Sequence, residues 1–201
     1  YSPNFKPDWN LQLFYSFNLI NHLGVYRTDI LRELEGFRIG FEGSQDYDLA
    51  LRFIEKIDEN QIRHIPQILY HWRAISGSLA KDSDEKLYAH GRARKALAEH
   101  FERIGEKVNI SRGYAQFHRV SFEVPKNVSA TVISSEKITT NIENTELMRI
   151  DSVSASSFNS AVKGSKGDVL IFLDRGIKPI SGDWIQEILG QIFRKNVGAV
   201  G

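Results

Sequence analysis

One run of residues constrains the fold of this chain more than any other: residues 169–173, Val-Leu-Ile-Phe-Leu, are all apolar and are bounded by Asp168 and Asp174. A strand that is apolar at every position is typical of a parallel sheet whose two faces are both covered by helices. Short, largely apolar segments at residues 130–134 and 147–150 predict further buried strands, and helical patterns separate and follow them. The sequence therefore predicts an α/β fold, with a layered sheet that carries helices on both faces.

Periodicity, capping residues and alternation predict the other elements along the chain. Helices are predicted over residues 29–34, 45–57, 84–104, 154–163 and 182–193. Strands are predicted over residues 18–26, 62–72, 115–124 and 197–200. Within the second of these strands, Pro66 lacks a backbone donor and therefore predicts an edge position or a bulge. Ser44 is expected to cap the helix that begins at Gln45, and Gly105 is expected to end the long helix.

The composition is that of an ordinary globular protein, and it excludes several functions. Hydrophobic residues make up 41% and charged residues 25% of the 201 residues, a length that suits one domain or two small ones. The net charge of +1 lacks the excess of positive charge that is typical of nucleic-acid-binding proteins. The absence of cysteine excludes disulfides and thiolate catalysis, and no apolar run reaches the ~18 residues of a membrane span. The first residues include neither an initiator Met nor the apolar core of a signal peptide, so the chain is expected to be a piece of a longer protein.

The candidate chemistry lies in two short segments. Asp46 follows Ser44 and Gln45 at the start of a predicted helix, and residues 70–73, Tyr-His-Trp-Arg, end a predicted strand. A carboxylate that acts as general base, beside His and Arg side chains that bind phosphate, is what sugar transfer from a nucleotide-sugar requires. Spacing alone leaves the ordinary interpretation open, because an acid in the first turn stabilises a helix and a strand histidine is more often structural. Asp48 is interpreted as structural, and so are the histidines at positions 22, 64, 90, 100 and 118, which lack metal-ligand spacing.

Four motifs in order give these residues a context. They are Phe-Lys-Pro-Asp-Trp at 5–9, His-Leu-Gly-Val-Tyr-Arg at 22–27, Glu-Gly-Ser-Gln-Asp-Tyr-Asp-Leu-Ala-Leu-Arg at 42–52 and Tyr-His-Trp-Arg at 70–73. In this order they resemble the acceptor half of a family 2 glycosyltransferase, an inverting enzyme of the GT-A type with a Rossmann-like layered sheet. Bacterial enzymes of surface-polysaccharide synthesis, including rhamnosyltransferases, are of this kind. The alternative is an unrelated α/β protein in which the motifs match by chance.

The resemblance divides the chain into three parts. Residues 1–107 are similar to the acceptor-side half of one GT-A-like module, and residues 108–124 to a linker and a connecting strand. Residues 125–201 are similar to the nucleotide-side half of a second module, through Phe-Leu-Asp at 172–174 and Gly-Asp-Trp at 182–184. This second half is interpreted as degenerate. Its strands are expected either to complete the sheet of the first part or to form a separate core.

The resemblance also implies roles for individual residues. Asp46 would be the general base in the inverting transfer of a hexose or deoxyhexose from a nucleotide-sugar to a surface polysaccharide. His71 and Arg73 would face the diphosphate, and Trp72 would either stack on a sugar ring or belong to the core. The motif at residues 5–9 would border the acceptor groove; the alternative is that it forms a loop anchored by Trp9. The remaining substrate-binding candidates are Lys6, Asp8, Trp9 and Gln45.

A divalent cation, Mg²⁺ or Mn²⁺, is the cofactor that the resemblance implies, held by a pair of acids after the buried strand. Here the positions of that pair hold Arg175 and Gly176, and Asp174 is the one acid beside them. The metal-ligand candidates are therefore His71 and Asp174. This departure favours a second hypothesis, in which the chain is a non-catalytic scaffold or a glycan-binding module.

The expected partners and location rest on the same resemblance. They are a nucleotide-sugar donor and a glycan acceptor, with no nucleic acid and no transmembrane segment. The protein is expected in the cytoplasm, either free or at the inner face of the membrane. The sequence does not indicate an oligomeric state.

Overall fold

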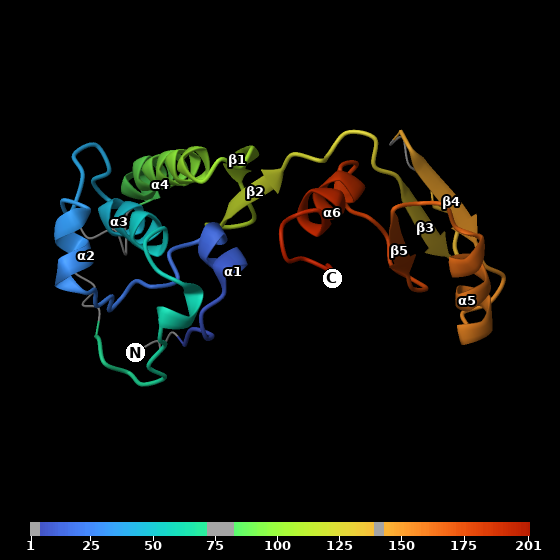
Figure 1. The fold of residues 1–201 in the computed structure, drawn as a ribbon, viewed down its shortest axis with the longest axis horizontal. Coiled ribbons are helices and arrows are strands. Elements are labelled where there is room, and N and C mark those ends of the chain that lie inside the picture. Colours follow the sequence, from blue (N-terminus) through green and yellow to red (C-terminus); the bar gives the residue numbers. More distant parts are fainter. Residues whose placement is uncertain (1–4, 72–82, 139–142) are drawn as a thin grey trace. The chain divides into compact units, whose positions relative to one another are not determined.

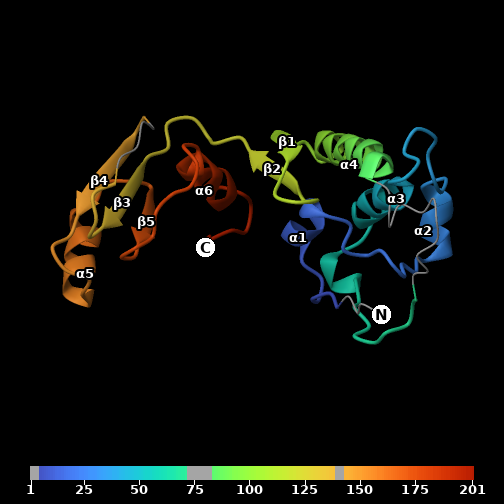
Figure 2. The same ribbon diagram turned by 180° about the vertical axis from the view of Figure 1, so that it is seen from behind.

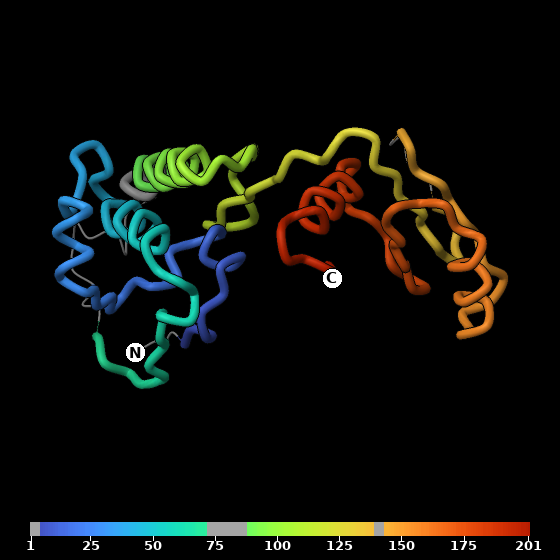
Figure 3. Tube along the Cα trace, viewed as in Figure 1, coloured from blue at the N-terminus to red at the C-terminus, as the bar shows by residue number. Residues whose placement is uncertain are grey.

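The computed structural model describes residues 5–71, 83–138 and 143–201. The chain divides into two compact units, Tyr1–Val120 and Ser121–Gly201 (Figure 1). The fold is mixed α/β, as predicted, but the described strands do not form one layered sheet: they belong to a two-stranded sheet and a three-stranded sheet. Figure 2 shows the same ribbon from behind, and Figure 3 follows the path of the chain as a tube. None of the described helices is long and apolar enough to cross a membrane.

Helices dominate the first unit and form its core. Its elements are α1 (Leu11–Ser16), α2 (Thr28–Glu33), α3 (Gln45–Ile54), the 3₁₀ turn η1 (Glu59–Gln61), α4 (Ser83–Arg103), β1 (Val108–Arg112) and the first residues of β2 (His118–Phe122), which crosses the boundary between the units. α3 packs against α4. Phe14 of α1, Leu51 of α3 and Phe101 of α4 are almost completely buried. This packing fixes the position of the first turn of α3, where Asp46 lies.

The start of α3 follows the prediction, although its cap does not. The helix begins at Gln45, but Ser44 donates its hydroxyl to the carbonyl oxygen of Ala89 at 2.7 Å and makes no side-chain capping bond. The helix ends at Ile54, earlier than the predicted residue 57. The serine hydroxyl thus joins the start of α3 to α4 instead of satisfying the first turn.

The end of α4 is confirmed. Gly105 has a φ of +75°, in the left-handed region that favours glycine. Beyond it, the backbone N–H of Glu106 donates to the carbonyl oxygen of Phe101 at 2.9 Å. This closure is typical of a helix that ends at a glycine.

Two strands predicted in the first unit are wrong. Residues 18–26 and 62–71 are irregular in the structure. Alternation of apolar and polar residues produces a strand only where a neighbouring strand supplies hydrogen-bond partners, and Pro66 cannot donate to such a ladder. Three apolar side chains of the second segment are more than half exposed: Ile65 59%, Ile68 52% and Leu69 57%.

The second unit holds a parallel three-stranded sheet. Its elements are β3 (Ala130–Ser134), β4 (Thr145–Arg149), α5 (Ala155–Gly164), β5 (Val169–Leu173) and α6 (Trp184–Ile192). β3 is central, and both β4 and β5 pair with it in parallel, so that Ala130 lies opposite Thr145 and Val169. The predicted strand at residues 197–200 is wrong. Among the described strands, none of the first unit belongs to this sheet.

Helices cover both faces of this sheet, as the apolar runs predicted. Val132 packs with Ile185 of α6, whereas the next residue, Ile133, packs with Ala161 of α5. Every residue of β3 is buried. The prediction of complete burial is wrong for Phe172, which is 53% exposed because β5 is an edge strand.

Gly167 lies where the chain that leads into β5 passes close to β3. A Cβ at this position would lie 2.5 Å from the backbone nitrogen of Thr131 and 2.8 Å from the carbonyl carbon of Ala130. Because both contacts are backbone atoms of the central strand, Gly167→Ala is expected to lower the free energy of unfolding by about 1–3 kcal/mol. The measurement is the midpoint of urea unfolding at an unchanged m-value.

Gly164→Ala is the matched control for this substitution. Its added Cβ would meet only Cε of Met148, at an ordinary 3.8 Å. The urea midpoint of the control should stay the same or rise slightly, since alanine is the better helix former. Equal midpoints for the two variants would contradict the close approach of the two backbones.

Candidate functional site

Asp46 lies in the first turn of α3, where three donors hold its carboxylate. The backbone N–H of Tyr47 donates to Oδ1 at 2.9 Å. The side-chain amide of Asn18 donates to Oδ2 at 3.2 Å, and the side-chain amide of Asn21 donates to the same oxygen. The residue is half-buried, at the end of the helix where the macrodipole favours an anion. The carboxylate is therefore held in one orientation.

Lys6 lies beside this carboxylate. Its ammonium donates to the carbonyl oxygen of Leu19 at 2.8 Å and to that of Asn21. Burial lowers the pKa of Lys6 from its ordinary value, and the negative charge of Asp46 opposes that shift. Lys6 thus fastens the loop whose amides hold the carboxylate. The structure brings together Asp46 and one of the predicted substrate-binding residues.

Two aromatic side chains extend the cluster beyond Asn21. The amide nitrogen of Asn21 lies 2.9 Å from Nε2 of His22, and because an amide nitrogen can only donate, the imidazole accepts there. The ring of His22 lies 5.6 Å from the ring of Tyr70, centroid to centroid, at an interplanar angle of 35°. Burial lowers the pKa of His22, an effect that Asp46 opposes and Lys6 reinforces. The imidazole is therefore uncharged at neutral pH.

Tyr26 is the last member of this group. Burial and the negative charge of Asp46 raise the pKa of Tyr26 to about 12, so its phenol stays protonated. Its ring packs against Phe53 of α3, with ring centroids 5.0 Å apart. The carboxylate thus has an uncharged, protonated phenol in its surroundings.

We call this cluster the Asp46 site, and the sequence predicted it only in part. The predictions named Asp46 and Lys6, but interpreted His22 as structural. A usable signal was motif membership, since His22 and Tyr26 belong to the motif at 22–27 and Tyr70 to that at 70–73. No sequence pattern indicated that Asn18 and Asn21 contact Asp46. The site consists of Lys6, Asn18, Asn21, His22, Tyr26, Asp46 and Tyr70.

Two other predicted residues contact structural partners. Oδ1 of Asp8 lies 3.0 Å from Nδ1 of His64. Trp9 donates its indole N–H to Oε2 of Glu59 at 3.1 Å, and its ring centroid lies 5.0 Å from that of Phe14. These contacts favour the alternative of a loop anchored by the tryptophan.

The remaining candidates of the first unit flank the Asp46 site in sequence. Gln45 precedes Asp46, and its Oε1 is buried without a hydrogen-bond partner in the described part of the chain. His71 follows Tyr70 and is exposed. Trp72 and Arg73 lie outside the described residues.

Asp174, the candidate of the second unit, lies at the carboxyl end of β5. Its Oδ1 accepts the backbone N–H of Arg175 at 2.7 Å. Glu136, which follows the neighbouring β3, accepts the backbone N–H of Gly176 at 3.0 Å. Within residues 5–71, 83–138 and 143–201, no group of three or more His, Cys, Asp or Glu side chains is placed to hold a metal ion. The described residues therefore do not fit a divalent cation, and the metal stays a prediction.

Asp48, one turn beyond the start of α3, has a structural environment. It is completely buried, and its Oδ2 accepts Nε–H of Arg52 at 3.0 Å and Nε–H of Arg38 at 3.1 Å. Arg52 also donates to the carbonyl oxygens of Leu34 at 2.8 Å and Gly36 at 2.6 Å. This network joins α3 to the chain that follows α2, in agreement with the interpretation of Asp48 as structural.

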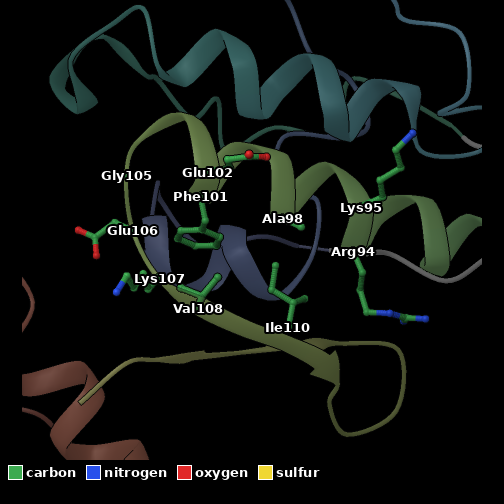
Figure 4. A pocket seen from close by; sticks show the side chains of 10 residues that line it. All are labelled: Arg94, Lys95, Ala98, Phe101, Glu102, Gly105, Glu106, Lys107, Val108 and Ile110. Atoms are coloured by element: carbon green, nitrogen blue, oxygen red, sulfur yellow. The ribbon is translucent and has the colours of Figure 1, made fainter. Parts of the chain in front are cut away.

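A groove of about 710 Å³ lies elsewhere in the first unit, between α4 and β1 (Figure 4). Apolar side chains of Ala98, Phe101, Val108 and Ile110 line it, with charged side chains of both signs around them. None of its lining residues belongs to the Asp46 site. The groove therefore does not contain the predicted chemistry.

Comparison with known proteins relates the whole chain to segments of two longer ones. The chain is 34% identical to the uncharacterized protein y4gI of Sinorhizobium fredii, over 98% of the chain and 27% of that protein. It is 28% identical to the O-antigen biosynthesis protein RfbC of Myxococcus xanthus, over 100% of the chain and 19% of that protein. The chain thus spans about a quarter and about a fifth of the lengths of these relatives. No protein-family model and no solved structure matches the chain.

Proposed function

We propose that this chain is part of a protein that builds a bacterial surface polysaccharide, and that its first unit acts on the sugar acceptor in a transfer from a nucleotide-sugar. The similarity of the whole chain to a segment of an O-antigen biosynthesis protein supports the class of pathway. The four ordered motifs that resemble a family 2 glycosyltransferase support the class of reaction. The cytoplasmic location of the protein stays a prediction.

One observation carries the proposal: the Asp46 carboxylate is held by amide donors beside Lys6. In an inverting transfer, the acceptor hydroxyl attacks the anomeric carbon and its proton passes to a carboxylate. The bond between that carbon and the diphosphate oxygen breaks, and its electron pair leaves with the nucleoside diphosphate. Asp46 takes the proton in this scheme. The amides of Asn18 and Asn21 orient the base, and Lys6 holds the loop that carries them.

The leaving diphosphate requires cationic or hydrogen-bonding groups of its own. We assign this role to His71 and Arg73, which lie one and three positions after Tyr70 in the sequence. Tyr70 contacts His22, so this end of the 62–71 segment lies next to the Asp46 site. No step of the scheme depends on a metal ion.

A second candidate function is a glycan-binding module without catalysis. The observation that favours it is at the end of β5, where Arg175 and Gly176 stand in the positions of the expected acid pair. In this case the Asp46 site binds sugar hydroxyls and transfers nothing. The two functions differ in whether a nucleotide-sugar binds.

The experiment that separates them is calorimetric titration of the chain with UDP-, dTDP- and GDP-sugars, with and without Mn²⁺. Binding of one donor that weakens at least about tenfold in His71→Ala would support transfer, because a diphosphate ligand loses one of its partners. Absence of binding for every donor would favour the glycan-binding module. A donor that binds equally well to His71→Ala would contradict the role given to His71.

A further inference from the structure

The Asp46 site combines a carboxylate with a pair of aromatic rings. His22 and Tyr70 are neighbours, with ring centroids 5.6 Å apart and planes inclined by 35°. Both side chains reach solvent, and Tyr70 is 45% exposed. Since Tyr70 is not enclosed in the core, its ring has surface available for a ligand.

Asn21 connects the ring pair to the carboxylate. Its side-chain amide donates to Oδ2 of Asp46 and, at 2.9 Å, to Nε2 of His22. A single amide group therefore bridges the Asp46 carboxylate and the His22 imidazole. A ligand of the size of one sugar ring can touch both of these side chains. Lys6 fixes this geometry, because its ammonium binds the carbonyl oxygens of Leu19 and Asn21.

This combination matches the chemistry of a pyranose. One face of such a ring carries C–H groups, which pack against an aromatic ring, and its rim carries hydroxyls, which need hydrogen-bond acceptors and donors. Sites for small polar ligands commonly pair an aromatic wall with a few fixed polar groups. The imidazole of His22 is uncharged, because burial lowers its pKa, so the aromatic wall carries no ion that must be desolvated.

We propose that His22 and Tyr70 form a subsite for a pyranose ring, placed so that a hydroxyl of that ring reaches the carboxylate of Asp46. The subsite rests on the proposed function only where it identifies this sugar as the acceptor. The binding of the sugar itself requires neither a donor nor a metal. The competing explanation is that Tyr70 only anchors the end of the 62–71 segment against His22.

The experiment is saturation-transfer NMR on the chain with the methyl pyranosides of glucose, galactose, mannose and rhamnose, each at millimolar concentration and without nucleotide-sugar or metal. At least one pyranoside should receive saturation on its ring C–H groups. Tyr70→Ala should raise its Kd about tenfold, in the range expected for truncation of an aromatic residue that a ligand contacts. Tyr70→Phe, which keeps the ring, should bind nearly as the unmodified chain does.

Tyr114→Ala is the matched control. Tyr114 is 90% exposed in the connection between β1 and β2, outside the Asp46 site. This variant should leave the Kd unchanged. Absence of saturation for all four pyranosides, or equal binding by Tyr70→Ala, would overturn the subsite.

A second measurement keeps the proposal open to refutation if Tyr70→Ala does not fold. In the unmodified chain, the bound pyranoside should shift the side-chain resonances of His22 and Tyr70 but not those of Tyr114. Shifts confined to other residues would overturn the subsite. The outcome is independent of transfer: a pyranoside that binds at Tyr70 without any donor binding would leave the subsite standing and remove the proposed transfer.

Discussion

Asp46→Asn is expected to lower the rate of sugar transfer by at least about 100-fold, the lower end of what a positioned general base contributes. Asparagine has the shape of aspartate, but its side chain cannot accept the proton of the acceptor hydroxyl. The three donors that hold the carboxylate add a second effect. Oδ1 and Oδ2 both accept hydrogen bonds here, so the NH₂ group of asparagine must face a donor on one side.

The measurement is kcat/KM for release of the nucleoside diphosphate, in the longest form of the protein that carries out transfer. Asp29→Asn is the matched control, because Asp29 is also an acid in the first turn of a helix but is exposed and paired with Arg27. This control should transfer sugar at the normal rate. An unchanged rate for Asp46→Asn would mean that Asp46 serves only the helix terminus.

Asp48→Ala is expected to lower the free energy of unfolding by about 3–5 kcal/mol, the range found when one partner of a buried ion pair is removed. The side chain of Asp48 is 0% exposed and that of Arg52 is 8% exposed, so the arginine would keep a buried charge without its carboxylate. Arg38, which also binds Asp48, would lose the same partner. A loss of this size is a large fraction of the roughly 5–15 kcal/mol by which a typical domain is stable.

The measurement is urea unfolding of the chain, monitored by circular dichroism. Glu33→Ala serves as the control, because it removes the exposed pair with Lys56, and exposed pairs contribute about 0–1 kcal/mol. A loss below about 1 kcal/mol for Asp48→Ala would contradict the structural role of the network. Transfer by a folded Asp48→Ala protein at the normal rate is expected, since Asp48 lies outside the Asp46 site.

The sequence predicted the elements whose causes are local. The start of α3 at Gln45 and the end of α4 before Gly105 agree with the predictions. β3 and β5 agree as well, since β5 is a short apolar run and β3 is largely apolar. Two predicted strands were wrong: residues 18–26 are irregular, and so are residues 62–71, the described part of the strand predicted over 62–72. A strand depends on a partner elsewhere in the chain. Alternation within one segment gives no information on that partner.

The same distinction between local and long-range causes explains which residues of the Asp46 site could be predicted. Asp46 could be predicted, because the local pattern of residues 42–52 indicates that it lies in the first turn of a helix. Its neighbours could not, because the path of the irregular loop over residues 17–27 decides which side chains reach it. No periodicity encodes that Asn21 and His22 approach a carboxylate that lies more than twenty positions later in the sequence.

The edges of the three-stranded sheet differ in how well they resist self-association. β4 has charged residues at Glu146 and Arg149, which disfavour the addition of a further strand. β5, the other edge, has five consecutive apolar residues and no charge. Such a segment is a template for intermolecular pairing when the sheet opens even partly. In concentrated or partly unfolded preparations, residues 169–173 are therefore where aggregation should begin, and a lysine at the half-exposed position 172 is the simplest means to suppress it.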